Sequence, residues 1–207
     1  MNVSKGMIYI VEDDASFRKS MERLLHASDF ETISCESATC FLAEKSIQHP
    51  ACLLLDVRLP DIDGLDLQQA LAEKGVHLPI VFMTGHGTIP MSVQAMKDGA
   101  IDFLPKPFDS TDLLDAIGLA LERDRQHQKE QFEQEKLNEL LDSLTPREQE
   151  ILRWVITGKL NKQIAWKLGI AEKTVKVHRA RVLQKLQVTS VAELVRFAEK
   201  ANIAPAE

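Results

Sequence analysis

The sequence predicts two domains, an α/β domain with a doubly wound, five-stranded parallel sheet and an all-α unit of four helices that contains a helix-turn-helix. Three observations lead to this prediction. Short apolar runs alternate with helical patterns through about the first 120 residues. Acidic residues dominate the first two thirds of the chain, and basic residues dominate the last third. A segment without glycine or proline joins the two parts.

The alternation of apolar runs and helical patterns is regular enough to name each element of the first domain. Alternation of this kind is typical of a parallel sheet with helices on both faces. Ligands of such sheets lie beyond the carboxyl ends of the strands. The expected strands are 7–11, 31–34, 52–55, 79–83 and 101–104, and the expected helices are 15–27, 37–44, 64–73, 88–97 and one that begins near 110.

Charge divides the chain. Residues 1–141 carry 13 Lys and Arg against 24 Asp and Glu, whereas residues 142–207 carry 12 against 7. The segment 121–141 is rich in charged residues and Gln, a composition that favours helix over flexible coil. We therefore expect an acidic domain over 1–120, a helical linker over 121–141 and a basic domain over 142–207.

Polar side chains follow four of the five expected strands. Glu12 and Asp13 follow the first strand, Asp56 the third, Thr84 the fourth and Lys106 the fifth. These groups should meet at one edge of the sheet, where clustered carboxylates would repel each other without a cation among them. Carboxylates are typical ligands of Mg²⁺, and a hydroxyl and an ammonium group complete a cradle for a phosphoryl group.

Other interpretations of these residues are weaker. Aspartate commonly ends a strand and starts a turn. A phosphohydrolase of the haloacid dehalogenase type also places an Asp nucleophile after a parallel strand, but it needs a second aspartate where this chain has Arg58. No P-loop motif occurs, and the spacing of Cys35, Cys40 and Cys52 is not that of a zinc site.

Residues 7–120 resemble the receiver domains of two-component response regulators, which have a flavodoxin-like fold. The resemblance is carried by "VEDD", "LPDIDG", "MTG" and "LPKPF", which occur in the order of that family. It implies that Asp56 is the phosphoacceptor, a carboxylate nucleophile that forms an acyl phosphate. It further implies Mg²⁺ ligands, phosphoryl-binding groups and an aromatic switch residue. The implied ligands are Glu12, Asp13, Asp56 and the main-chain carbonyl of Arg58, and the other groups are Thr84, Lys106 and Phe103.

The resemblance also concerns residues beside this set. Glu12 stands where the family more commonly has aspartate, which lengthens one side chain and keeps its charge. Asp14 is expected to lie outside the inner set of metal ligands and to cap the following helix. The family resemblance implies a cis peptide at Lys106-Pro107, which proline permits.

The second domain begins with "SLTPREQEILRWVITG". Thr145 is expected as the N-cap of its first helix, with Pro146 as the first helical residue and Glu148 as the capping-box partner. A short helix should begin at Asn161, and a turn at Gly169 should separate it from a longer helix. The longer helix is expected over about 172–186, and a last helix over about 190–200.

Basic residues are concentrated in this helix-turn-helix. Between Lys159 and Lys185 there are eight Lys and Arg and a single acid, Glu172, which predicts binding to the phosphate backbone of DNA. One face of the long helix can enter a major groove, with Lys176 directed at guanine and Val177 at a thymine methyl. A basic helix can also be a solvated face, and His178 can be a structural hydrogen-bonding residue. The expected DNA-binding residues are Asn161, Lys162, Lys173, Thr174, Lys176, Val177, His178, Arg179, Arg181 and Lys185.

Residues 142–200 resemble the LuxR-type helix-turn-helix of the NarL/FixJ class of response regulators. The resemblance is carried by "LTPREQEIL", "NKQIA" and "TVKVHRARVLQKL". Ala171 departs from it, because the family often has a serine cap there, whose loss weakens a helix start by about 1 kcal/mol. Ala180 is a second departure, because it offers no side-chain donor at a groove-facing position.

Together the two resemblances imply a transcription regulator that is switched by phosphorylation of Asp56 and is not itself an enzyme. Its implied partners are a sensor histidine kinase, double-stranded DNA, a second copy of the chain on phosphorylation and RNA polymerase, and the family tends to activate rather than repress. A receiver that acts only as a protein-interaction module fits poorly with the basic helix. We expect a cytoplasmic protein without a membrane partner, because the sequence has no apolar stretch of about 18 residues, no secretory signal pattern and no disulfide framework.

Overall fold

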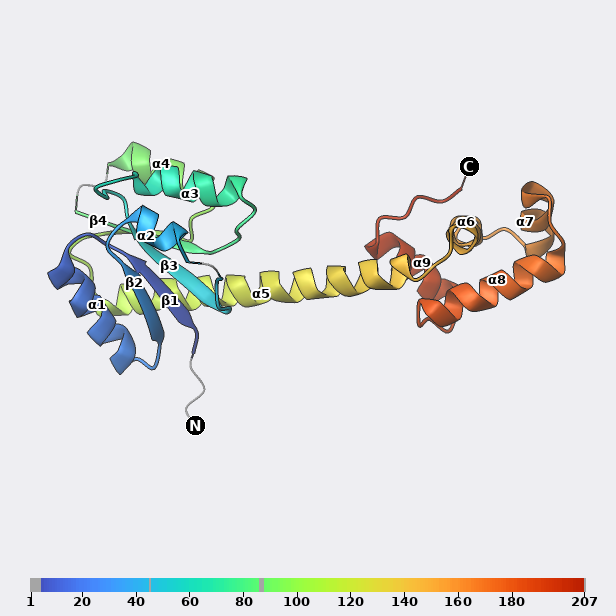
Figure 1. Ribbon diagram of the computed structural model, residues 1–207, viewed down its shortest axis with the longest axis horizontal. Coiled ribbons are helices and arrows are strands. Elements are labelled where there is room, and N and C mark those ends of the chain that lie inside the picture. Colours follow the sequence, from blue (N-terminus) through green and yellow to red (C-terminus); the bar gives the residue numbers. More distant parts are fainter. Residues whose placement is uncertain (1–4, 45, 86–87, 207) are drawn as a thin grey trace. The chain divides into compact units, whose positions relative to one another are not determined.

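The computed structural model describes residues 5–44, 46–85 and 88–206. The chain forms two compact units, the first ending at Lys129 and the second beginning at Glu130 (Figure 1). None of the described helices combines the length and the apolar character that a bilayer-spanning segment needs.

The first unit contains a five-stranded sheet in which all strands are parallel, as the sequence predicts. The strand order is β2-β1-β3-β4-β5, so β3 lies at the centre (Figure 1). This order brings the carboxyl ends of β1 and β3 next to each other. The strands are β1 (Met7–Val11), β2 (Glu31–Cys35), β3 (Ala51–Asp56), β4 (Ile80–Thr84) and β5 (Asp102–Pro105).

Helices follow the strands, close to the ranges that the sequence predicts. The main difference is α2, which covers fewer residues than the expected 37–44. Its start is set by the Ser37 side chain, which accepts a hydrogen bond from the Cys40 N–H, and it already ends at Leu42. The helices of this unit are α1 (Ala15–Ala27), α2 (Ala38–Leu42), α3 (Gly64–Glu73), α4 (Ile89–Lys97) and the first part of α5 (Ser110–Asp142).

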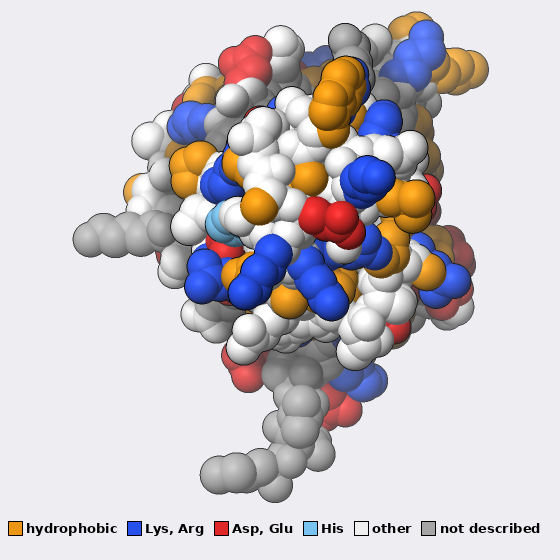
Figure 2. Space-filling model, turned by 90° about the vertical axis from the view of Figure 1, so that its right-hand side faces the viewer, with side chains coloured by type: hydrophobic (Ala, Val, Ile, Leu, Met, Phe, Trp, Pro, Cys, Tyr) orange, Lys and Arg blue, Asp and Glu red, His pale blue; other side chains and the backbone are white. Residues whose placement is uncertain are grey.

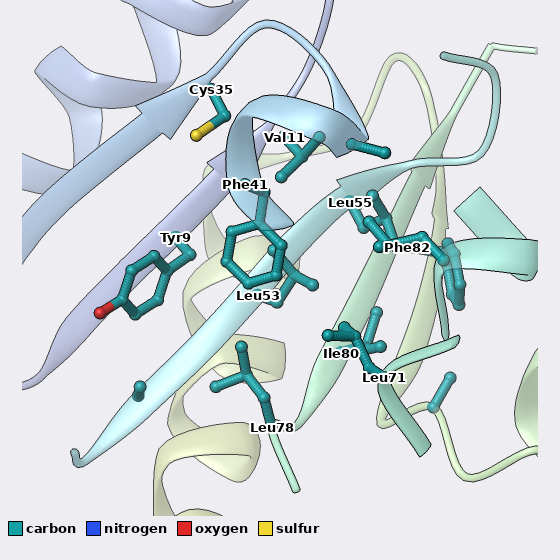
Figure 3. Packing of buried hydrophobic residues seen from close by; sticks show 14 of the residues in the cluster. Tyr9, Val11, Cys35, Phe41, Leu53, Leu55, Leu71, Leu78, Ile80 and Phe82 are labelled. Atoms are coloured by element: carbon teal, nitrogen blue, oxygen red, sulfur yellow. The ribbon is translucent and has the colours of Figure 1, made fainter. Parts of the chain in front are cut away.

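Two apolar cores form, one on each face of the sheet. The core under α2, α3 and α4 contains Tyr9 and Phe41, whose rings meet edge to face with centroids 5.6 Å apart (Figure 3). The core under α1 and α5 contains alternate residues of the same strands, such as Ile8 and Ile10. Because successive side chains of a strand point to opposite faces, the continuous apolar runs of β1 and β3 supply both cores.

Helix α5 is far longer than the other helices, and it runs through all of 121–141, the segment expected to be a helical linker. Its buried residues, from Leu113 to Asp124, all lie in the first half, where the helix packs on the sheet. In the middle, residues 129–136 are exposed, and Phe132 is 69% exposed. Near its end Leu137, Leu140 and Leu141 are partly buried against the core of the second unit. Tertiary packing therefore supports the first half, whereas helix-forming composition supports the middle.

The second unit contains four shorter helices around its own apolar core. They begin at or within one residue of the positions that the sequence predicts. Thr145 caps α6 and forms the expected capping box with Glu148, and Gly169 ends α7 in the left-handed conformation with φ 63°. Ala171 precedes α8 without a side-chain cap. The helices are α6 (Pro146–Val155), α7 (Asn161–Leu168), α8 (Glu172–Lys185) and α9 (Val191–Lys200).

Glu148 is a buried charged residue that ties α6 to α8. Its side chain is 3% exposed and accepts hydrogen bonds from the Thr145 N–H (2.9 Å) and from Lys185 Nζ (2.7 Å). The hydrogen bond from Lys185, followed by that from the Thr145 backbone, lowers the pKa of Glu148 to about 2. The ionised form is thus stabilised by folding, since it would titrate near 4.5 without these contacts.

We expect Glu148→Gln to destabilise the second unit by roughly 1.5–3 kcal/mol at neutral pH, because a charge-assisted buried hydrogen bond is lost. Because the folded pKa is depressed, the contribution of Glu148 is present above pH 4.5 and is lost as the pH falls toward about 2. Both tryptophans, Trp154 and Trp166, lie in this unit, so urea unfolding of the whole chain followed by tryptophan fluorescence measures it alone. Equal pH dependence of the two proteins over that interval would contradict the assignment.

Candidate functional site

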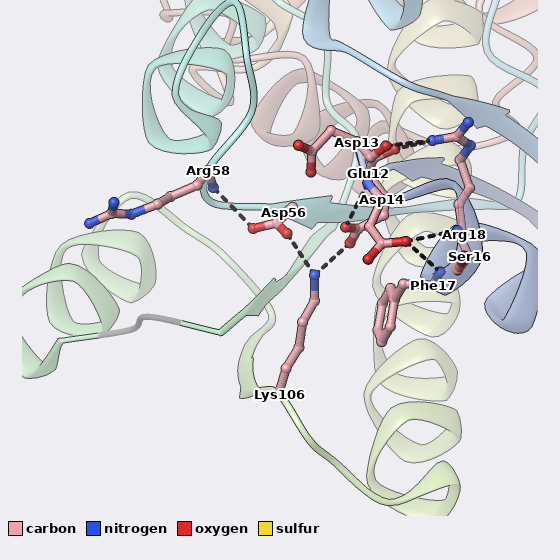
Figure 4. Close-up of polar contacts among 9 residues, drawn as sticks. All are labelled: Glu12, Asp13, Asp14, Ser16, Phe17, Arg18, Asp56, Arg58 and Lys106. Carbon is pink, nitrogen blue, oxygen red and sulfur yellow. Dashed lines mark hydrogen bonds and ion pairs between the residues drawn. The ribbon is translucent and has the colours of Figure 1, made fainter.

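The carboxyl edge of the sheet gathers acidic side chains from two adjacent strands. Glu12 and Asp13 directly follow β1, and Asp56 is the last residue of β3 (Figure 4). Each of the three offers a carboxylate oxygen, and these oxygens lie within 4.8 Å of one another. Glu12 and Asp56 are buried, whereas Asp13 is exposed. The pairing of β1 with β3 therefore confirms that the predicted strand-end carboxylates meet.

Lys106 reaches into this cluster from the segment after β5. Its Nζ lies 2.6 Å from Asp56 Oδ2 and 2.6 Å from Glu12 Oε2 (Figure 4). The Lys106 N–H donates to the Thr84 carbonyl at 2.7 Å, which fixes the start of this segment beside β4. The peptide Lys106-Pro107 is cis, as the sequence resemblance implies. One ammonium therefore bridges two of the three carboxylates.

The surroundings of these groups shift the pKa values of Glu12 and Lys106. Burial raises the pKa of Glu12, although hydrogen bonding to Lys106 opposes the shift. Burial alone would lower the pKa of Lys106, but its hydrogen bonds to Asp56 and Glu12 outweigh that effect and raise it. The three carboxylates and one ammonium leave a formal charge of −2, which a divalent cation would neutralise. The donor set fits Mg²⁺, a hard cation that prefers carboxylate oxygens.

Backbone geometry holds Asp56 in position. Its Oδ1 accepts a hydrogen bond from the Arg58 N–H at 3.0 Å, so Asp56 and Arg58 form a tight turn at the strand end. Gly64, the first residue of α3, lies so close that a Cβ there would be 2.4 Å from the Asp56 carbonyl oxygen. A side chain at position 64 would therefore push α3 away from β3.

The remaining predicted residues of this site lie around the same edge. Thr84 is the last residue of β4 and is 1% exposed. Phe103 lies on β5, is partly buried and has its ring 6.0 Å from that of Phe82. Asp14 caps α1 as expected, since its Oδ1 accepts from the N–H groups of Ser16 and Phe17.

Two contacts at this edge were not predicted from the sequence. The ring of Phe17 lies 4.3 Å from Lys106 Nζ, a cation–π contact that supports the ammonium from the side of α1. Arg18 Nη1 donates to the backbone carbonyls of Glu12 and Asp13, which ties the acidic pair to the first turn of the same helix. Both residues belong to an amphipathic helix pattern that, by itself, carries no signal for these roles.

The second unit presents the predicted basic surface. Figure 2 shows Lys and Arg side chains gathered on the face of this unit that is turned to the viewer. Lys176 and Val177 on α8 are exposed, and Lys162 is exposed near the start of α7. Arg179 Nη1 donates to Asn161 Oδ1 at 2.9 Å, so these two predicted contact residues also join α8 to α7. The other exposed members of the predicted set are Lys173, Thr174 and Arg181.

Two other members of the predicted DNA-binding set are only partly exposed. Lys185 donates to Glu148 Oε2 at 2.7 Å and to the Ser143 carbonyl at 2.8 Å, so its ammonium is occupied within the unit. His178 is partly buried, and its Nδ1 has no hydrogen-bond partner within the described chain. The sequence signal for Lys185, its place in a basic helix, does not reveal that Glu148 lies beside it.

The similarity to known proteins covers both units. The response regulator receiver domain family matches residues 8–118, and the luxR family of bacterial regulatory proteins matches residues 142–198. Nodulation protein W of Bradyrhizobium diazoefficiens is 45% identical over 200 residues, which are 97% of this chain and 88% of that protein. Response regulator protein TodT of Pseudomonas putida is 41% identical over the same shares of the two chains.

Solved structures agree with these relatives. The response regulator StyR has a TM-score of 0.87 and 46% identity, over 94% of this chain and 98% of that one. Full-length FixJ from B. japonicum has a TM-score of 0.57 and 36% identity, over 97% and 99%. A receiver domain implies a histidine kinase as partner, and a LuxR-type domain implies DNA. The chain therefore belongs to the NarL/FixJ class of two-component response regulators, which are phosphorylation-dependent transcription regulators and not enzymes.

Proposed function

We propose that Asp56 accepts the phosphoryl group and that this modification controls DNA binding by the second unit. The bridge from Lys106 Nζ to both Asp56 and Glu12 is the observation that carries the proposal, since it puts a fixed cation beside the strand-end carboxylate. An Asp56 oxygen attacks phosphorus, and the bond from phosphorus to the imidazole nitrogen of the kinase breaks. The imidazole leaves with that electron pair, so an acyl phosphate replaces a phosphohistidine.

Around Asp56 we propose the roles that the receiver family implies. Glu12, Asp13, Asp56 and the main-chain carbonyl of Arg58 would hold Mg²⁺, with Glu12 acting through water. When bound, Mg²⁺ supplies positive charge that offsets the phosphoryl oxygens. Thr84 donates a hydrogen bond to the new phosphoryl group, Lys106 neutralises it, and Phe103 responds as the switch residue. The burial of Thr84 beside β5 and the partial burial of Phe103 support these roles.

Asp13→Ala should abolish phosphorylation by a small phosphodonor in the presence of Mg²⁺ while the fold is retained, because it removes a metal ligand and relieves carboxylate repulsion. Asp14→Asn is the matched control: it removes one negative charge from the adjacent residue, and asparagine preserves the helix cap. Intact-protein mass spectrometry measures the phosphorylated fraction. Wild-type labelling of Asp13→Ala would refute the ligand assignment.

On the second unit we propose that Lys176 and Val177 face the major groove and that the flanking basic residues contact phosphates. The exposure of Lys176 and the 44% exposure of Val177 support this role. Lys185 is better explained as the partner of Glu148. The proposed phosphate-contacting and helix-positioning residues are Asn161, Lys162, Lys173, Thr174, His178, Arg179 and Arg181.

Lys176→Ala should reduce discrimination between a duplex selected by the protein and a random duplex by about 1–3 kcal/mol, the value of a good base contact. Lys162→Ala should weaken binding to both duplexes similarly and lower the salt slope by about one. Fluorescence anisotropy titrations at several salt concentrations measure both quantities. If Lys176→Ala weakens binding to the two duplexes equally, its groove role is wrong.

We further propose that the protein acts in the cytoplasm, as an activator that contacts RNA polymerase. We also propose that phosphorylation produces a dimer through α4, β5 and α5. Apolar side chains that a monomer leaves in water support the dimer surface: Ile89 is 81% exposed and Leu119 is 65% exposed. Two linked recognition helices would bind two half-sites without any new base contact.

Beryllofluoride with Mg²⁺, which mimics the acyl phosphate, should therefore shift the protein from monomer to dimer. It should also raise the affinity for a duplex with two half-sites far more than for a single half-site. Sedimentation and DNA titrations measure the two effects. Asp56→Asn, the control, should show neither change, and equal affinity gains with an unchanged mass would rule out dimerisation as the switch.

A further inference from the structure

The opposite edge of the sheet, far along the strands from Asp56, contains a cavity. Its volume is about 270 Å³, several times the roughly 30 Å³ that one water molecule occupies in the liquid. The cavity is lined by α3, by α5, by the segment that leads into β4 and by the segment that precedes β5. Apolar residues of the lining include Leu71, Leu78 and Ile80. All of these segments belong to the first unit.

Unsatisfied polar atoms are concentrated in this cavity. Within the described residues, four buried side-chain atoms have no hydrogen-bond partner, and three of them belong to residues that line it. They are Gln68 Oε1, Asp124 Oδ1 and His127 Nδ1. Buried polar groups are normally hydrogen-bonded, so the gathering of three exceptions in the lining of one cavity is unusual and marks it as a candidate binding site.

The existing hydrogen bonds of Asp124 and Gln68 show which of their atoms could still bind a ligand. Asp124 is fully buried, and its Oδ2 accepts from His49 Nδ1 and from the Ala51 N–H, both at 2.7 Å. Gln68 is 6% exposed, and its Nε2 donates to the carbonyls of Ala95 (3.3 Å) and Asp98 (3.1 Å). The amide orientation of Gln68 is thereby fixed. Each residue keeps one acceptor oxygen without a donor.

The other lining groups favour a flat, donor-rich molecule. The rings of His77 and His127 lie 4.6 Å apart with 42° between their planes, which gives the cavity an aromatic wall. Asp98 is a second carboxylate of the lining, and besides the two histidines Arg123 is its one basic side chain. The apolar wall and the two acceptor oxygens together match a molecule with an apolar or aromatic body and an amine or amidine group.

We propose that this cavity, formed by α3, α5 and the amino ends of β4 and β5, binds a small amine or amidine. Both acceptor oxygens are closed off from water in the structure, so the lining side chains must move apart before the cationic group can donate to Gln68 Oε1 and Asp124 Oδ1. The body of the ligand packs between the histidine rings and the apolar wall. Asp124 belongs to α5 and also holds the first residue of β3, so the ligand would contact the same helix that continues into the linker. This site is separate from the phosphoacceptor edge and does not depend on the function proposed for it.

Benzamidine is a suitable probe, and benzoate is its control, because the two have the same ring but opposite hydrogen-bonding character. The whole ¹⁵N-labelled chain is titrated with each compound and followed by two-dimensional NMR. We expect benzamidine to bind saturably with a Kd of about 1 mM or lower and to shift the amide signals of Gln68, Gly99, Ile101 and His127. Benzoate should leave these signals unchanged.

Asp124→Asn should weaken benzamidine binding by at least about tenfold, because its carbonyl oxygen can serve His49 and Ala51 while an amide donor replaces the free acceptor. Glu122→Gln is the matched control, since Glu122 is an exposed carboxylate on the same helix and lies outside the cavity lining. A second variant avoids the buried residues altogether. Ala72→Phe, at an exposed lining position of α3, should abolish benzamidine binding by filling the space.

Three results would overturn the proposal. Absence of saturable shifts would mean that the cavity holds ordered water only. Shifts confined to the neighbourhood of Glu12, Asp13 and Asp56 would mean that the amidinium binds the acidic cluster instead. Benzamidine binding that persists in Ala72→Phe, or benzoate binding of equal strength, would show that the acceptor oxygens of this cavity do not select the ligand.

Discussion

Repulsion among carboxylates at one end of the parallel sheet is the constraint on which the rest of the first unit depends. The pairing of β1 with β3 forces Glu12 and Asp56 together, and Asp13 stays within 4.8 Å of both. Lys106, from the segment after β5, offsets part of that repulsion, and Phe17 supports its ammonium. The remaining negative charge favours binding of a cation at this edge, together with an anionic group that binds the same cation. A domain optimised for stability alone would have no reason to keep this arrangement.

Sequence periodicity was sufficient for the fold and for most of the acidic edge. Strand ends in a parallel sheet have known relative positions, so Glu12, Asp56 and Lys106 could be brought together once the strands were assigned. Contacts between a helix side chain and a distant segment follow no such rule. Arg18 supports the acidic pair through main-chain carbonyls, and Lys185 meets Glu148 across 37 residues of sequence. Those contacts depend on helix packing, which residue spacing does not specify.

The amino edge of the sheet illustrates the same limit more strongly. Gln68, Asp124 and His127 come from two helices that are far apart in sequence, and none of them follows a strand. No motif marks them, because their shared property is a missing hydrogen bond, which exists only in three dimensions. The two ends of the sheet therefore differ in kind. One end is predictable from the strand pattern, and the other becomes visible only when every buried polar atom has been assigned a partner.

The central strand β3 has a consequence for how this protein can vary during evolution. All six of its residues are buried, its first amide is held by Asp124 and its last side chain is held by Lys106. It thus has no position at which a neutral surface substitution can occur, and drift in this segment must be accompanied by compensating changes on both faces of the sheet. The polar stretch of α5 around Phe132 carries no such restriction. Related chains can therefore diverge freely in the linker while β3 keeps its size and polarity.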